Sequence, residues 1–197
     1  MPKQQPIPKR WINEFKKRGL RFVSDLVVKS ADREALAKSW KRARKSHCDD
    51  QDPEAQKILA VLQGGKLPSL KVKNVKFKGG TQKGLFAATS IKKGSVIGFY
   101  TGRLLKEDEV DVDSDYVFGF GEAAYKKWLI DAQRVGNYMR FANHSKKGNM
   151  EVLELYYDGL PRIVFVALRH IKEGEQLLYD YGNEYWKNKG INPDKSL

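Results

Sequence analysis

Apolar and polar positions repeat with one period up to about residue 68 and with another beyond it. Before residue 68, apolar residues return every third or fourth position, which predicts amphipathic helices. The first helix follows Pro8 and can end at Gly19, a second begins at an N-cap Ser30, and a third has Pro53 at its first helical position. The predicted apolar face of the first helix consists of Trp11, Ile12 and Phe15.

After Pro68, short runs of β-branched and aromatic residues alternate with glycine-containing turns. Strands this short and this frequent predict a mainly β domain. The predicted strands cover 71–78, 84–88, 96–101, 116–120, 150–157, 162–168 and 176–181, with a short helix over Ala123–Trp128. We therefore expect a helical extension over 1–69, a β-rich domain over 70–186, and a short basic tail over 187–197.

A pattern of small, apolar and lysine positions occurs twice in the β-rich part. Ala87-x-x-x-Ile91-Lys92-x-Gly94 is followed by Ile97, and the same order returns from Ala167 to Leu177 with its glycine at Gly174. Glycine adopts a positive φ without steric cost. The pattern therefore predicts two similar turns, each closed by its glycine.

Composition excludes several classes of protein. A hydrophobic fraction of 41% in 197 residues can form a buried core. The single cysteine, Cys48, excludes an internal disulfide and a Cys-rich zinc cluster, and the three histidines lack metal-ligand spacing. No apolar run approaches the roughly 20 residues that span a bilayer. We expect an intracellular, soluble protein without a metal and without membrane contact.

Positive charge is concentrated in the extension. The net charge is +13, and residues 1–70 contribute 16 Lys or Arg against 8 Asp or Glu, whereas residues 71–197 contribute 21 against 16. Such an excess suits an acidic partner such as nucleic acid or chromatin, although a solvated surface has the same composition. An electrostatic role for the extension is only slightly favoured.

Four groups of motifs change the interpretation when they are taken together. They are Lys83-Gly84-Leu85-Phe86-Ala87 with Tyr100-Thr101-Gly102; Ile130-Asp131-Ala132; Arg140-Phe141-Ala142-Asn143-His144-Ser145; and Leu178-Tyr179-Asp180-Tyr181-Gly182. In order and spacing, they resemble the SET-domain lysine methyltransferases from about residue 71 to 186. The ending Gly182-x-x-Tyr185-Trp186 resembles compact members of this family that lack the Cys-rich, zinc-binding tail.

This resemblance implies a fold of small curved sheets with a threaded C-terminal segment, which would bring the surroundings of Asn143 and Tyr181 together. It also implies S-adenosylmethionine as the cofactor and the amine of a protein lysine as the methyl acceptor. Such a displacement depends mostly on orientation, desolvation and aimed dipoles. A narrow apolar channel would also lower the pKa of the substrate lysine and favour its neutral form.

The resemblance assigns catalytic roles to two tyrosines. Tyr181 matches the family's catalytic tyrosine. Tyr179 occupies a position where the family has Phe or Tyr, and its hydroxyl implies mono- or dimethylation rather than trimethylation. Tyr100 and Tyr116 match aromatic walls of the lysine channel, although a role in the core is nearly as well supported.

Cofactor contacts are expected from three places in the chain. These are the loop residues Lys83, Gly84 and Leu85, the pair Asn143 and His144, and the C-terminal Trp186, for which a packing role is an equal alternative. Gln82 stands where the family has its first glycine, and this leaves the shape of the cofactor loop open.

Positive charge favours a histone, a histone-like protein or a nucleosome as substrate, with nuclear or chromatin association in a eukaryotic or host cell and a cytoplasmic location otherwise. Two alternatives stay open. One is a lysine methyltransferase of a non-histone protein. The other is a degenerate SET module that binds through its basic surface, for which Gln82 is the only support.

Overall fold

The computed structural model describes residues 8–46, 53–62, 64, 66–77, 79–121, 125–157 and 159–190. The chain forms two compact units. The first contains the residues up to Leu67 together with Gly98–Arg140 and Leu153–Val164. The second contains Pro68–Ile97, Phe141–Val152 and the residues from Phe165 onward. Cys48 and the last seven residues of the predicted tail lie outside the described residues.

The N-terminal helices agree with the sequence prediction except in detail. Helix α1 (Lys9–Lys16) follows Pro8, and Gly19, with φ +68°, donates its N–H to Lys16 O beyond the end of the helix. Trp11 and Phe15 are buried, whereas Ile12 is 44% exposed, so its predicted place on the buried face is wrong.

The next two helices lie close to their predicted positions. Ser30 begins a 3₁₀ turn, η1 (Ser30–Asp32), and α2 (Arg33–Ser46) starts after this turn, two residues later than an N-cap at Ser30 predicts. Helix α3 (Pro53–Leu62) begins at its proline as expected, and Ile58 and Leu59 are buried.

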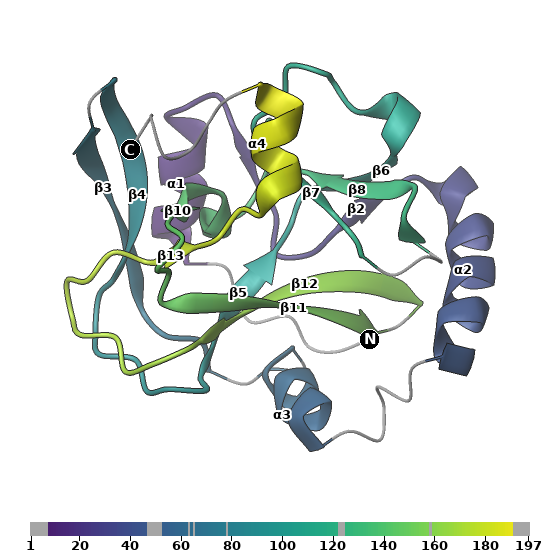
Figure 1. The fold of residues 1–197 in the computed structure, drawn as a ribbon, viewed down its shortest axis with the longest axis horizontal. Coiled ribbons are helices and arrows are strands. Elements are labelled where there is room, and N and C mark those ends of the chain that lie inside the picture. The colour runs from purple at the N-terminus through teal and green to yellow at the C-terminus, as the bar shows by residue number, and fades with distance from the viewer. Residues whose placement is uncertain are drawn as a thin grey trace. The chain divides into compact units, whose positions relative to one another are not determined.

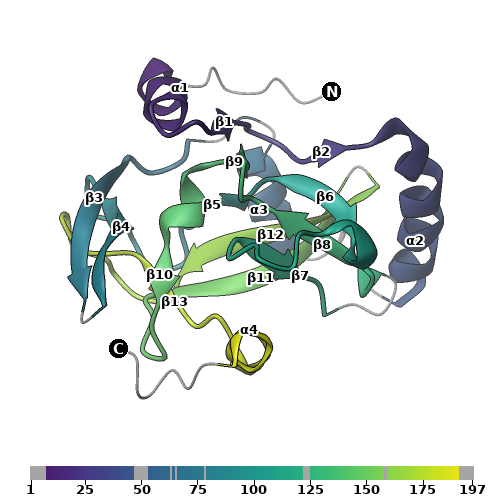
Figure 2. The same cartoon turned by 90° about the horizontal axis from the view of Figure 1, so that it is seen from above.

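The extension contributes strands to the sheets of the first unit. Strand β1 (Arg21–Phe22) pairs in parallel with β9 (Val135–Gly136), and β2 (Val27–Val28) pairs in parallel with β6 (Arg103–Lys106). Figure 2 shows α1 beside β1. These pairings make the extension part of the first unit.

Aromatic rings and ion pairs, among them Lys29–Glu109 and Asp32–Lys106, add to this attachment. Phe15 packs edge-on against Phe22, and Trp11 lies 5.0 Å from Tyr138 between ring centroids. Asp25 forms an ion pair with Arg162, whose side chain is only 8% exposed. Burial raises the pKa of Tyr138 to about 12, so this ring stays neutral at physiological pH.

A four-stranded sheet in the order β2-β6-β8-β7 forms much of the first unit (Figure 1). Strand β8 (Trp128–Asp131) pairs antiparallel with both β6 and β7 (Val117–Gly119). Residues 123 and 124 of the predicted short helix lie outside the described residues, and Trp128 begins β8 rather than ending a helix. A second 3₁₀ turn, η2 (Glu107–Glu109), follows β6, and η4 (Tyr138–Phe141) follows β9.

The chain passes from one unit to the other within three strands, β5 (Val96–Tyr100), β11 (Met150–Tyr157) and β12 (Leu160–Ala167). They form one sheet in the order β11-β12-β5. Both ends of each of these strands lie within two residues of the predicted ends. Strand β12 is buried from Pro161 to Ala167, as expected for a central strand.

The second unit is formed around a long hairpin and a short parallel pair. Strands β3 (Leu70–Phe77) and β4 (Gly80–Ala87) pair antiparallel over eight residue pairs, from Leu70 opposite Ala87 to Phe77 opposite Gly80. Strand β10 (Asn143–His144) pairs in parallel with β13 (Leu178–Tyr179), and helix α4 (Asn183–Lys189) follows.

The repeated sequence pattern forms two turns that bond to each other. Ile91 and Ile171 exchange both backbone hydrogen bonds, at 2.8 and 2.9 Å. Gly94 N–H donates to Ala167 O, and the equivalent Gly174 N–H donates to Ala87 O. Both glycines have a positive φ, as predicted. The repeat therefore produces a near-symmetric contact inside the second unit. The mainly β fold with an N-terminal helical segment is confirmed.

Candidate functional site

A pocket of about 530 Å³ lies in the second unit. Its walls come from the β3–β4 hairpin, from the segment that follows β10 and from the start of β13. Its lining residues are Val75, Phe77, Gln82, Asn143, His144, Ser145, Lys146, Lys147, Gln176 and Leu178. The mixture of apolar side chains, carboxamides, a hydroxyl and two ammonium groups suits an organic ligand that carries both a flat apolar part and an anionic part.

Asn143 and His144, the predicted cofactor residues, both line this pocket. The pairing of β10 with β13 sets Asn143 opposite Leu178 and His144 opposite Tyr179. The carboxamide of Asn143 also donates to the backbone carbonyl of Lys83 at 3.1 Å. One residue therefore links the predicted cofactor loop to the predicted Asn-His motif.

Tyr181 is tied to the same motif through its backbone and its side chain. Its N–H donates to His144 Nδ1 at 3.1 Å, and its hydroxyl donates to the carbonyl of Ala142 at 2.8 Å. These bonds fix the orientation of Tyr181 relative to the pocket wall.

Aromatic rings surround Tyr181 within the second unit. The centroid of its ring lies 4.8 Å from those of Tyr179 and Tyr185, and 6.0 Å from that of Trp186, to which it is nearly parallel. Trp186 also packs edge-on against His144. Helix α4, which begins two residues after Tyr181, therefore supplies two of the rings that hold it.

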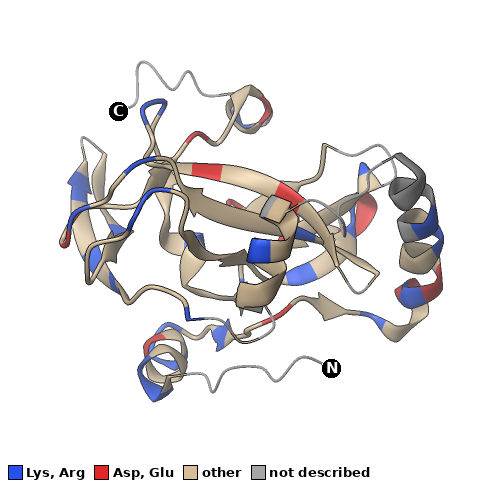
Figure 3. Ribbon diagram, turned by 90° about the horizontal axis from the view of Figure 1, so that it is seen from below, with Lys and Arg blue, Asp and Glu red and all other residues tan. Residues whose placement is uncertain are grey.

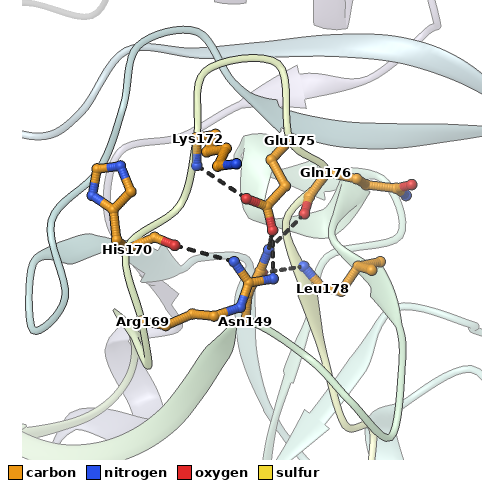
Figure 4. A network of polar contacts seen from close by, with 7 residues as sticks. All are labelled: Asn149, Arg169, His170, Lys172, Glu175, Gln176 and Leu178. Atoms are coloured by element: carbon orange, nitrogen blue, oxygen red, sulfur yellow. Dashed lines mark hydrogen bonds and ion pairs between the residues drawn. The ribbon is translucent and has the colours of Figure 1, made fainter.

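A polar network holds the segment before β13 (Figure 4). The buried Asn149 donates to Glu175 Oε1 and to the carbonyl of Gln176, and its own oxygen accepts from Leu178 N–H. The guanidinium of Arg169 bonds to Glu175 and lowers the pKa of that carboxyl to about 2. The network fixes the main chain that carries Gln176 and Leu178 to the pocket wall.

The predicted cofactor loop forms part of a regular strand, β4. Lys83 bonds through its ammonium to Asn74, and Leu85 is completely buried. A Cβ atom at Gly84 would lie 2.6 Å from Val75 Cγ2 and 2.8 Å from Gln176 Nε2, so packing requires glycine here. Three lysines, Lys71, Lys73 and Lys76, lie on the neighbouring strand β3 (Figure 3).

The two predicted channel tyrosines belong to the first unit and lie beside each other there. The Tyr100 hydroxyl donates to the backbone carbonyl of Tyr116 at 2.9 Å. The guanidinium carbon of Arg140 lies 3.8 Å from the centroid of the Tyr116 ring, which is a close cation–π contact. Burial lowers the pKa of Arg140, although a guanidinium stays charged in proteins. These three residues belong to the first unit, whereas all residues that line the pocket belong to the second.

Two of the ten pocket residues, Asn143 and His144, were predicted as cofactor contacts. The other eight were missed: Val75, Phe77, Gln82, Ser145, Lys146, Lys147, Gln176 and Leu178. The hairpin register could have identified two of them, because the Gly79-Gly80 turn sets Val75 opposite Gln82. Lys146 and Lys147 directly follow the Asn-His-Ser motif. Within the described ranges, no three His, Cys, Asp or Glu side chains gather where they could hold a metal ion. No helix in the described part of the chain is long and apolar enough to cross a membrane.

Comparison with known proteins gives consistent matches. The family model described as SET domain matches residues 82–182. N-lysine methyltransferase KMT5A-A of Danio rerio is 32% identical over 152 residues, which cover 72% of this chain and 43% of that protein. Histone-lysine N-methyltransferase EHMT1 of Mus musculus is 33% identical over 113 residues, or 54% of this chain and 9% of that protein. The chain thus spans less than half the length of either relative.

Among solved structures, ctPRC2 in an autoinhibited conformation bound to S-adenosylmethionine has a TM-score of 0.56 and 29% identity. The match covers 66% of this chain and 17% of that one. Strand β3, which supplies Val75 and Phe77 to the pocket, precedes the residues that the family model matches.

Proposed function

We propose that this chain, which belongs to the SET-domain family, transfers a methyl group from S-adenosylmethionine to the amine of a lysine in another protein. The proposal rests on one observation. Two motifs that lie far apart in the sequence, Asn143-His144 and the one that contains Tyr181, lie together in the second unit. Asn143 and His144 form a wall of the pocket, and His144 also holds the backbone of Tyr181. Similarity to two proteins named lysine methyltransferases supports the same reaction.

The pocket residues fit S-adenosylmethionine by their chemistry. The side chains of Val75 and Phe77 suit a flat base, the carboxamides suit ribose hydroxyls, and Lys146 and Lys147 suit a carboxylate. Trp186, the third predicted cofactor contact, packs against His144 and Tyr181 but is not among the residues that line the pocket. When bound, the cofactor supplies an activated methyl group on a sulfonium.

The chain's own contribution is a fixed set of dipoles. The hydrogen bond from the Tyr181 hydroxyl to the Ala142 carbonyl, at 2.8 Å, fixes the orientation of the hydroxyl and turns the lone pairs of its oxygen away from the shared proton. Oxygens arranged in this way stabilise positive charge without reorganisation during the reaction. The apolar faces of the rings around Tyr181 lower the local polarity, which strengthens these interactions and favours a neutral amine. We assign Tyr181 as the catalytic tyrosine and Tyr179 as the residue that limits the product to mono- or dimethyl-lysine.

A histone or histone-like protein is the proposed substrate, and chromatin the proposed location. The relatives' names support this choice, and the net charge of +13 suits a substrate bound to nucleic acid. Contact of the basic extension with nucleic acid is part of the same proposal. A non-histone protein lysine is the alternative, and the assay described next separates the two.

The test is a methyl-transfer assay with radiolabelled S-adenosylmethionine. Core histones, nucleosomes and a cell extract serve as acceptors. The protein should label a histone, and Tyr181→Phe should lower the rate roughly 100-fold, because it removes one placed hydroxyl and keeps the ring packing. Tyr157→Phe, in β11 of the first unit, is the matched control and should leave the rate unchanged.

Each other outcome identifies a different function. Label found only on non-histone proteins of the extract would replace the histone by another protein substrate. Absence of label from all acceptors, together with absence of cofactor binding in calorimetry, would contradict the enzyme and support a SET module that acts by binding alone.

A further inference from the structure

Gln82 lies at the position where a glycine is expected, yet the backbone there requires no glycine. The residue belongs to an unbroken run of eight antiparallel pairs, in which it lies opposite Val75. Regular strand backbone accepts any L-residue, and glycine is needed only for special dihedrals or close approach. The side chain of Gln82 is therefore free to have a role of its own.

Close approach is instead required two residues later. A Cβ atom at Gly84 would meet Val75 Cγ2 at 2.6 Å and Gln176 Nε2 at 2.8 Å. Since residues two apart in a strand share a face, Gln82 and Gly84 lie on the same side of the hairpin as Val75. The missing side chain at Gly84 thus makes room for the carboxamide of Gln176 on the face that also carries the carboxamide of Gln82.

Both carboxamides line the pocket, together with the Asn143 carboxamide and the Ser145 hydroxyl. A carboxamide offers two donors and one acceptor oxygen, so it can bind a hydroxyl, a carboxylate or an amine. A glycine at residue 82 would offer the pocket no side-chain donor or acceptor. Glutamine in place of glycine at residue 82 therefore adds a polar side chain to the wall that the β3–β4 hairpin supplies. This wall would otherwise consist of backbone and the apolar Val75 and Phe77.

We propose that Gln82 is a ligand-binding residue whose carboxamide hydrogen bonds to a polar group of the bound S-adenosyl compound. This inference rests on the proposed function and concerns the same pocket. It makes Gln82 a determinant of affinity, where sequence comparison alone treats it as a defect of the cofactor loop. One hydrogen bond of this kind changes a dissociation constant roughly three- to tenfold.

Isothermal titration calorimetry with S-adenosylhomocysteine tests this inference without turnover. Gln82→Ala and Gln82→Gly remove the carboxamide, and only the second also loosens the strand. Thr81→Gly is the matched control. It loosens the same strand one residue away, on the opposite face, at a residue outside the pocket lining. Thermal unfolding of each variant without ligand verifies that it is folded.

The expected result is a three- to tenfold higher Kd for both Gln82 variants and an unchanged Kd for Thr81→Gly. Equal affinity of wild type and Gln82→Ala would overturn the inference and leave the proposed function standing. An equal loss in Thr81→Gly would overturn it as well, since strand flexibility would then explain the effect. A wild-type protein that binds no S-adenosylhomocysteine would overturn the proposed function together with the inference.

Discussion

At the scale of single residues, the site depends on side chains that each join their own segment to a distant one. Asn143 joins β10 to the cofactor loop, His144 joins β10 to Tyr181, and Asn149 joins the start of β11 to the segment before β13. Buried polar groups of this kind are costly when a partner is lost. Their geometry therefore determines where the reactive groups lie.

Tyr179 allows a direct test of product specificity. Its ring packs edge-on against Phe165 at 4.9 Å and is 8% exposed. Tyr179→Phe keeps this packing and removes only the hydroxyl, which leaves more room beside the amine. We expect the product to shift toward a higher methylation state, as measured by mass spectrometry of the substrate. An unchanged product distribution would contradict the role given to Tyr179.

Glu175 should make stability depend on pH in the acid range. Its bond to Arg169 lowers its pKa in the folded protein from 4.5 to about 2. A lowered pKa stabilises the fold above pH 4.5, and this contribution is lost as the pH falls from 4.5 to 2. Glu175→Gln should therefore lower the free energy of unfolding by about 1 kcal/mol at pH 7, because solvent weakens the pair, and by less near pH 2.

Glu173→Gln is the control for this measurement, since Glu173 lies in the same turn with an exposed side chain. Denaturant unfolding at several pH values measures both variants. A Glu175→Gln effect that stays constant from pH 7 to pH 2 would show that the ion pair is not its cause.

At the scale of elements, attachment of the extension depends on β1, β2 and the rings of α1. Phe15 is completely buried and packs against Phe22. Phe15→Ala should lower the free energy of unfolding by about 3–5 kcal/mol, because it leaves a cavity. Ile12→Ala, on the exposed side of the same helix, should change it by less than about 1 kcal/mol. Similar losses in the two variants would show that α1 does not pack as described.

The sequence predicts an element where that element has its own hydrophobic periodicity or begins or ends at a proline or glycine. The longer strands β3, β11 and β12, the second half of β4 and the start of α3 at Pro53 could be predicted because their patterns are local. The first half of β4, before Gly84, was missed. The two-residue strands β1, β2, β9 and β10 could not, since pairing with a distant segment defines them. The two-residue strand β13 lies inside the strand predicted over 176–181. Strand β6, with the sequence Arg-Leu-Leu-Lys, has no alternation to mark it, and its partner β8 begins at a tryptophan that local propensity also allows in a helix.

At the scale of the whole molecule, the repeated turns show how a local pattern becomes a long-range contact. Nothing in the sequence indicates that the turn around Ile91 bonds to the turn around Ile171, although both turns were predicted. The candidate site, too, could be predicted only where its residues belong to a local motif. Motif order identified Asn143, His144 and Tyr181, whereas Val75 and Phe77 join them only through the hairpin register and precede the family match. The division at residue 69 stays a prediction.

The most direct test of the central claim is to locate the transferred methyl group by tandem mass spectrometry. The substrate would be isolated after reaction with wild-type protein and with Tyr181→Phe. The account predicts a methyl group on the side-chain nitrogen of a lysine, present with wild type and strongly reduced with the variant. A methyl group on arginine or another residue, or equal lysine methylation by Tyr181→Phe, would contradict it.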